Sequence, residues 1–200
     1  MLTSKEAVER VLRALAERLD FVKAPRTELA VCGGAALHVL GLMTRAVTKD
    51  VDAFALVRRG RKGVSLVKAS PLPDHLRREA AVVARDFNLP MDWLNAGPAD
   101  LLDLGLPKGL AQRLHPVTYG KRLTVCYLDR IDQIHFKLYA ATDQGPDSRH
   151  MVDLRALKPG KDELEAAARR AVTHDPSEGF LNQLKGCLRH IGHGDVADRI

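Results

Sequence analysis

Apolar residues recur at helical spacing in the first part of the chain. Between Thr3 and Leu19 they repeat every three or four positions, and Ser4 stands where an N-cap side chain would accept a hydrogen bond from the first turn. This pattern predicts an amphipathic helix. A second run with helical spacing, from Asp74 to Phe87, predicts another helix.

Shorter apolar runs between these helices predict strands. The run Glu28–Cys32 is typical of a buried strand, and it ends at the pair Gly33-Gly34. The apolar, helix-competent segment Ala35–Leu40 follows. A loop that contains Arg45 then leads into a predicted strand from Val47 to Leu56. The expected order is therefore strand, glycine turn, helix, loop and strand.

Two further strands are expected before the pattern changes. Met91–Leu94 follows Pro90 and places Asp92 between apolar neighbours, as in a core strand with one functional face. The apolar run Leu123–Leu128 predicts a later strand, paired through the turn Tyr119–Lys121 with residues around Val117.

Helical periodicity dominates from Asp129 onward, in stripes over residues 131–141, 151–157 and 164–172. Strands in the first two thirds and helices in the last third predict an α+β fold, with a small mixed β-sheet core packed on helices and a helical C-terminal subdomain. The expected domains are residues 1–128 and 129–200.

Composition excludes several classes of protein. A hydrophobic fraction of 46% with 28% charged residues is ordinary for a globular domain. No apolar run approaches the length of a membrane span and the first residues do not form an export signal, so we expect no membrane partner and a cytoplasmic location. The three cysteines lack zinc-ligand spacing, which favours reduced structural thiols.

A formal charge of +6 favours partners that carry phosphate, such as nucleotides or RNA. Only 4% of residues are aromatic, which disfavours a module that stacks single-stranded bases. The basic turn Arg58–Gly63 is either an RNA-facing patch or a charged hairpin tip, and the sequence alone does not separate these interpretations.

The strongest candidate for chemistry is the pair Asp50 and Asp52. Residues two apart on a strand project from the same face, and two adjacent carboxylates require a cation. Mg²⁺ prefers such oxygen ligands. The turn Gly33-Gly34 at a helix start would expose backbone N–H groups to phosphate oxygens. The alternative is a solvated strand end whose acids pair with Lys49 or Arg45.

These segments resemble a known family. Gly33-Gly34-Ala35-Ala36, the run Arg45–Asp52 and then Asp92 are similar to the nucleotidyltransferase superfamily related to DNA polymerase beta. More narrowly, they resemble bacterial nucleotidyltransferase-like proteins that include the abortive-infection type toxins. The similarity resumes at Asp129–Ala140, which resembles a helix bearing a phosphate-facing lysine, and at Arg149–Leu154.

The resemblance implies a role for each matching residue. Gly33 and Gly34 would bind the triphosphate, with help from Lys137 and from Arg45 at the rim. Asp50 and Asp52 would bind two Mg²⁺ ions, and Asp92 would be the third acid that completes the second metal site. The rivals for that third position are Asp86, Asp100 and Asp103. One departure is Ala35, since many members of the superfamily have serine after the glycine.

The leading hypothesis is therefore a magnesium-dependent nucleotidyltransferase, an enzyme that moves a nucleoside monophosphate from a nucleoside triphosphate to an acceptor hydroxyl. The resemblance allows RNA, a protein or a small molecule as the acceptor, and it allows a toxin–antitoxin pair with an antitoxin protein as partner. The alternatives are a catalytically inactive nucleotidyltransferase-fold binding module and a basic protein that contacts nucleic acid without a site.

Two other groups of residues allow a functional and a structural interpretation. His190 and His193 with Asp195 contain potential metal ligands, but the glycines at 192 and 194 favour a flexible tail. Arg149, His150 and Asp153 either contact substrate or form an ion pair on a helix face.

Overall fold

The computed structural model describes residues 1–43, 47–61 and 63–200 of the chain. It divides into two compact units, Met1–Asp129 and Arg130–Ile200. A mixed six-stranded sheet lies in the first unit, and the second is helical. The predicted α+β class is confirmed.

The first three elements form as their sequence patterns predict. Helix α1 (Lys5–Phe21) begins after Ser4, whose hydroxyl accepts a hydrogen bond from the backbone N–H of Ala7 at 3.2 Å. Its apolar stripe is buried. Strand β1 (Thr27–Cys32) is almost entirely buried and leads directly into the short helix α2 (Gly33–Val39).

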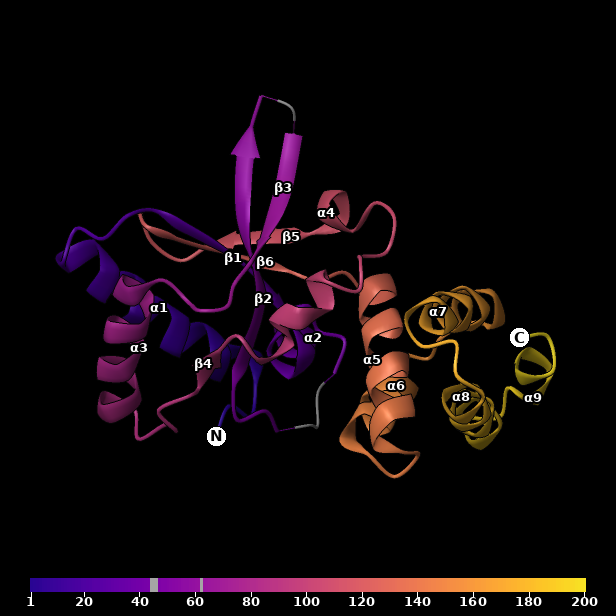
Figure 1. Ribbon diagram of the computed structural model, residues 1–200. Coiled ribbons are helices and arrows are strands. Elements are labelled where there is room, and N and C mark those ends of the chain that lie inside the picture. The colour runs from indigo at the N-terminus through magenta and orange to yellow at the C-terminus, as the bar shows by residue number, and fades with distance from the viewer. Residues whose placement is uncertain (44–46, 62) are drawn as a thin grey trace. The chain divides into compact units, whose positions relative to one another are not determined.

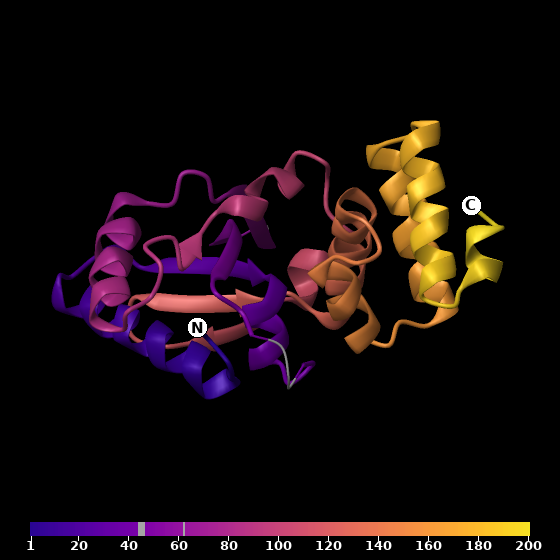
Figure 2. The ribbon, with the colours of Figure 1, turned by 90° about the horizontal axis from the view of Figure 1, so that it is seen from below.

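The sheet of the N-terminal unit combines parallel and antiparallel pairs. Its strands lie in the order β3-β2-β1-β6-β5, and the short β4 pairs with β2. Strand β1 is antiparallel to β2 and parallel to β6. The remaining strands are β2 (Val51–Gly60), β3 (Gly63–Lys68), β4 (Leu94–Asn95), β5 (His115–Thr118) and β6 (Leu123–Tyr127). Figures 1 and 2 show these strands running through the unit, with α1 and α3 beside them.

One hydrophobic core joins the sheet to the helices. Leu12 of α1, Leu29 of β1 and Leu76 of α3 (Asp74–Asp86) are fully buried within it. Trp93 is also fully buried, and its indole N–H donates to the carbonyl of Ala80 at 2.9 Å. The 3-10 helix η1 (Gly97–Leu102) and helix α4 (Leu110–Arg113) complete the N-terminal unit.

Two strands differ from their predicted bounds. The strand predicted from Val47 to Leu56 begins later, at Val51, and continues to Gly60 because it forms a hairpin with β3. Sequence analysis did not predict β3, whose residues alternate only between exposed and partly buried. The strand predicted over Met91–Leu94 is wrong for its first residues, which form a turn.

The C-terminal unit consists of helices, as predicted. Helix α5 packs against α6, α7 and α8, and α8 packs against α9. The predicted flexible tail is wrong, because α9 is helical and buries Val196 and Ala197. None of the helices in the described ranges combines the length and apolar character needed to cross a membrane. The helices are α5 (Arg130–Gln144), α6 (Arg149–Ala156), α7 (Lys161–His174), α8 (Glu178–His190) and α9 (Gly194–Ala197).

Candidate functional site

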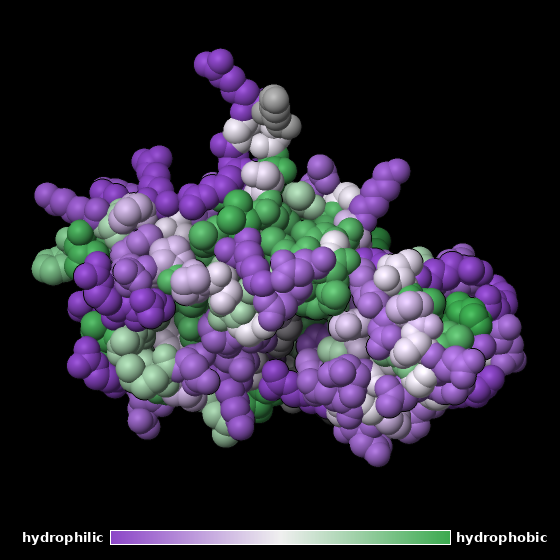
Figure 3. Space-filling model, in the orientation of Figure 1, coloured by the Kyte–Doolittle hydropathy of each residue, from purple (hydrophilic) through white to green (hydrophobic). Residues whose placement is uncertain are grey.

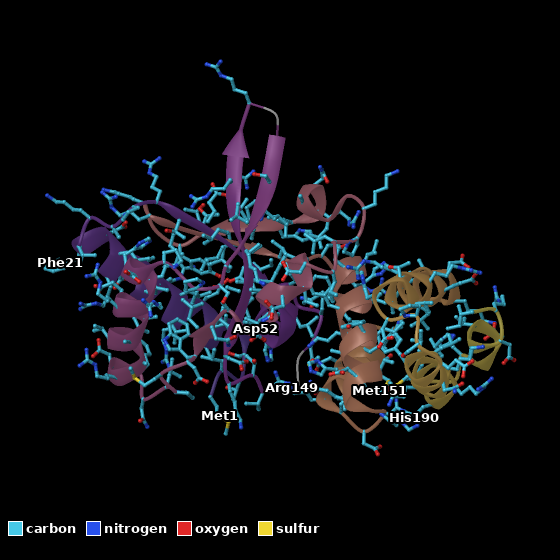
Figure 4. All side chains as sticks on the ribbon, viewed as in Figure 1. Met1, Phe21, Asp52, Arg149, Met151 and His190 are labelled. Atoms are coloured by element: carbon cyan, nitrogen blue, oxygen red, sulfur yellow. The ribbon has the colours of Figure 1, made fainter. Side chains whose placement is uncertain are left out.

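The register of the sheet places Asp52 between the end of β1 and the short strand β4. Because β1 and β2 are antiparallel, Asp52 lies opposite Cys32, the residue just before Gly33. On the other side of β2, Asp52 pairs in register with Asn95 of β4. Its carboxylate is partly exposed at this edge of the core (Figure 4).

The two glycines lie in close contact with side chains. Gly33 has φ +72°, and a Cβ atom on it would lie 2.7 Å from Asp52 Oδ2. A Cβ atom on Gly34 would lie 2.8 Å from the Cβ of Thr48. The Cα atoms of both glycines are therefore covered by Asp52 and Thr48, whereas the sequence predicted a glycine turn with its backbone N–H groups exposed to phosphate. Their small size has a structural reason here.

Thr48 connects Asp50 to the same glycine pair. Its backbone forms hydrogen bonds of 2.9 and 3.0 Å with Leu2, and its side chain rests on Gly34. Its hydroxyl lies 3.1 Å from Asp50 Oδ1. Asp50 itself precedes β2, so the prediction that both acids lie on one strand is wrong. Asp52 nevertheless contacts Gly33 directly, and Asp50 is linked to Gly34 through Thr48.

Asn95 is the polar residue that β4 presents to Asp52. Its amide Nδ2 donates to Asp52 Oδ1 at 3.1 Å, and its Oδ1 accepts from the backbone N–H of Gly97 at 2.8 Å. The bond from Gly97 fixes the orientation of the amide, because only the oxygen can accept it. A neutral amide thus occupies the place where sequence analysis expected a third acid.

Asp92 lies in the exposed turn that precedes β4, not on a strand. Two of its rivals are engaged elsewhere, since Asp100 and Asp103 both form ion pairs with Lys68. Asp86 is exposed at the last position of α3. Within the described residues, no group of three or more acidic, histidine or cysteine side chains is placed to hold a metal ion. Arg45 falls outside the described residues.

Lys137 belongs to the C-terminal unit, where it is buried on α5. Its Nζ lies 2.6 Å from Oδ2 of Asp153 on α6, and the two side chains are only 5% and 11% exposed. Asp153 therefore forms an ion pair, as one of its two interpretations expected. The pair joins two helices, however, and does not lie along one helix face. Arg149 is exposed at the start of α6, and Met151 is buried (Figure 4).

His150 lies beside this ion pair and remains uncharged at neutral pH. Burial, followed by the charges of Lys137 and Arg149, lowers the pKa of His150 from 6.5 to about 4. The carboxylates of Asp153 and Asp143 oppose this shift but do not outweigh it. Its Nδ1 is buried and has no hydrogen-bond partner among the residues that the structure describes.

Comparison of the chain with protein-family models, with curated proteins and with solved structures finds no match. The resemblance to nucleotidyltransferases consequently rests on the residues of the chain itself. Of these, the structure places Asp52 against Gly33, and it places Asp50 beside Thr48, which covers Gly34.

Sequence analysis missed Thr48 and Asn95. The only signal for Thr48 was its place two residues before Asp50, where a hydroxyl can bond to the following acid. Asn95 gave no signal, because β4 has only two residues and so shows no alternation of apolar and polar positions.

Replacement of Gly33 by alanine is expected to destabilise the N-terminal unit by about 3 kcal/mol, from left-handed backbone strain and from the clash with Asp52. Gly41→Ala is the matched control, because Gly41 also has positive φ, +68°, but no atom of the described residues would lie within 4 Å of the added Cβ. The control should cost about 1 kcal/mol, as measured by urea unfolding. Equal losses in the two variants would show that Asp52 does not press on Gly33.

Lys137→Met should destabilise the C-terminal unit by about 3–5 kcal/mol, because it leaves the Asp153 carboxylate buried without its partner. The double variant Lys137→Met with Asp153→Leu should recover most of this loss, since both charges are then absent. Thermal unfolding followed by circular dichroism measures both effects. If the double variant is as unstable as the single one, the loss does not come from an unpaired Asp153 carboxylate.

Acid should destabilise the C-terminal unit through His150. The unfolded chain binds a proton near pH 6.5 and the folded one only near pH 4, so stability is lost as pH falls through this window. The loss is at most about 1.4 kcal/mol per pH unit within it, and less in so far as solvent screens the partly exposed ring. His150→Gln should remove this part of the pH dependence of unfolding. An unchanged pH profile in the variant would show that His150 titrates normally.

Proposed function

We propose that the chain is a nucleotidyltransferase that binds a magnesium–nucleoside triphosphate complex at Asp50 and Asp52 and transfers the nucleoside monophosphate to an acceptor hydroxyl. One observation carries the proposal. Where β1 ends and β2 begins, Asp52 lies against Gly33 and Asp50 is linked through Thr48 to Gly34, and these four residues have the spacing of the resembling family.

The donor set suits Mg²⁺ without a third acid. Magnesium demands oxygen ligands, keeps several waters, and is commonly held by one or two carboxylates together with substrate phosphates. Asp50 and Asp52 supply the carboxylates, so the phosphates and water would supply the rest. When bound, the ion would neutralise charge on the α-phosphate and on the departing pyrophosphate.

The neighbouring residues would keep the two carboxylates in position. Asn95 donates to Asp52 Oδ1, and the Thr48 hydroxyl lies within hydrogen-bond distance of Asp50 Oδ1. Thr48 is itself fixed by its backbone bonds to Leu2. Such outer contacts orient acidic ligands and restrict their rotamers, which is how a site of this kind positions phosphate for in-line attack.

A second candidate is a nucleotidyltransferase-fold module that binds nucleotide without transferring it. The specific observation in its favour is Asn95, a neutral amide beside Asp52 where a third carboxylate was expected. Such a module would still bind a triphosphate in the presence of Mg²⁺.

Asp52→Asn and Asp50→Asn should each reduce transfer of label from an α-labelled triphosphate to total RNA or protein by about a hundredfold or more, because the ion loses one of its two carboxylates. Asp92→Asn is the matched control. It removes the same charge from an exposed turn and should retain activity within about twofold.

Three results would separate the alternatives. Loss of transfer in the Asp92 variant would contradict the site with two acids. Wild-type protein that transfers nothing, but shows magnesium-dependent nucleotide binding in calorimetry that Asp52→Asn abolishes, would indicate the binding module. Wild-type protein that neither transfers nor binds a triphosphate would end the proposal.

A further inference from the structure

The β2–β3 hairpin extends beyond the sheet as a two-stranded ribbon. Strand β1 pairs with β2 only as far as Leu56, whereas β2 and β3 continue to pair from there to Gly60 and Gly63. Residues 58–61 are all exposed. Figure 1 shows the ribbon projecting from the rest of the N-terminal unit.

All the charged side chains of this ribbon are positive. No acidic residue occurs between positions 57 and 68, while Arg58, Arg59 and Arg61 lie close to its tip. Figure 3 shows hydrophilic residues toward the tip and apolar ones nearer the base. The guanidinium of Arg59 is bound to Glu28 at 2.8 Å. The side chains of Arg58 and Arg61 form no ion pair or hydrogen bond with any residue that the structure describes.

Two unpaired guanidinium groups on a projecting ribbon are suited to an external anion. Arginine presents a planar fork of N–H donors that matches the oxygens of phosphate. A charged tip also protects an edge strand from aggregation, but that role requires charge of either sign. The uniform positive sign favours a partner with a regular array of negative charges.

The side chains of the ribbon indicate how such a partner would be contacted. Residues 57–68 include no aromatic side chain, so the ribbon offers no surface on which unpaired bases would stack. Its β3 residues Val64, Leu66 and Val67 have no groups that hydrogen-bond to base edges. The groups left to make polar contact near the tip are guanidinium groups, which suit the phosphate oxygens of the sugar–phosphate backbone, as in recognition of paired nucleic acid by shape.

We propose that the β2–β3 hairpin is an arm that binds the phosphate backbone of a base-paired RNA through Arg58 and Arg61. The choice of RNA over DNA rests on the proposed function, because both have a terminal 3′-hydroxyl but only RNA also offers 2′-hydroxyl groups as acceptors. Binding by the arm itself requires neither a triphosphate nor a metal ion.

The test is binding of a fluorescent RNA hairpin, with a DNA hairpin of the same sequence alongside, in EDTA and without triphosphate. Arg58→Gln with Arg61→Gln should weaken RNA binding about tenfold or more at low salt, and reduce the slope of log affinity against log salt by about 1 to 2. Unfolding temperature should not change, because both side chains are exposed and unpaired.

The matched control is Arg78→Gln with Arg85→Gln, which removes the same charge from exposed positions on α3. It should bind RNA within about twofold of the wild type. Equal weakening in both double variants, equal or tighter binding of the DNA hairpin, or no RNA binding by the wild type at low salt would each overturn the proposal.

The same assay separates this inference from the proposed function. Asp52→Asn should bind the RNA hairpin as the wild type does, because its carboxylate is not part of the arm. Loss of nucleotide transfer with RNA binding retained would identify a failure at the acidic site. Loss of RNA binding only in the hairpin variant, whatever the transfer activity, supports the arm.

Discussion

The contact between the Asp52 carboxylate and the Cα of Gly33 determines the architecture of the acidic site. It exists because β1 and β2 are antiparallel and in a register that sets Cys32 opposite Asp52. A shift of that register by one residue would turn Asp52 toward the other face of the sheet. The glycine, the register and the acid therefore depend on one another.

The elements with a long apolar periodicity were the ones that the sequence predicted best. Helix α1, its cap at Ser4 and helix α3 formed as predicted, because an apolar stripe over several turns and a capping side chain are local signals. The glycine pair and the two acids were singled out from their short spacings, and their role in binding stays a prediction. The helical C-terminal unit followed from the same reasoning.

Contacts between distant segments were not predictable in the same way. Asn95 and Asp52 meet only because a strand of two residues joins the edge of β2, and Asp92 lies in the turn just before it. Lys137 forms a buried pair with Asp153, a contact that helical periodicity alone does not distinguish from a surface position. Such pairings depend on how helices and strands pack against one another. Local sequence patterns do not specify that packing.

Leu2 and Thr48 form a backbone bridge, which joins the first residues of the chain to the segment that carries Asp50. Leu2 is buried in the hydrophobic core, which ties this part of the chain down. Loss of that anchor would release Thr48 while the strands stay paired. The Asp50 carboxylate would then lose its orienting hydroxyl while Asp52 kept its bond to Asn95, so the two acids would differ in mobility.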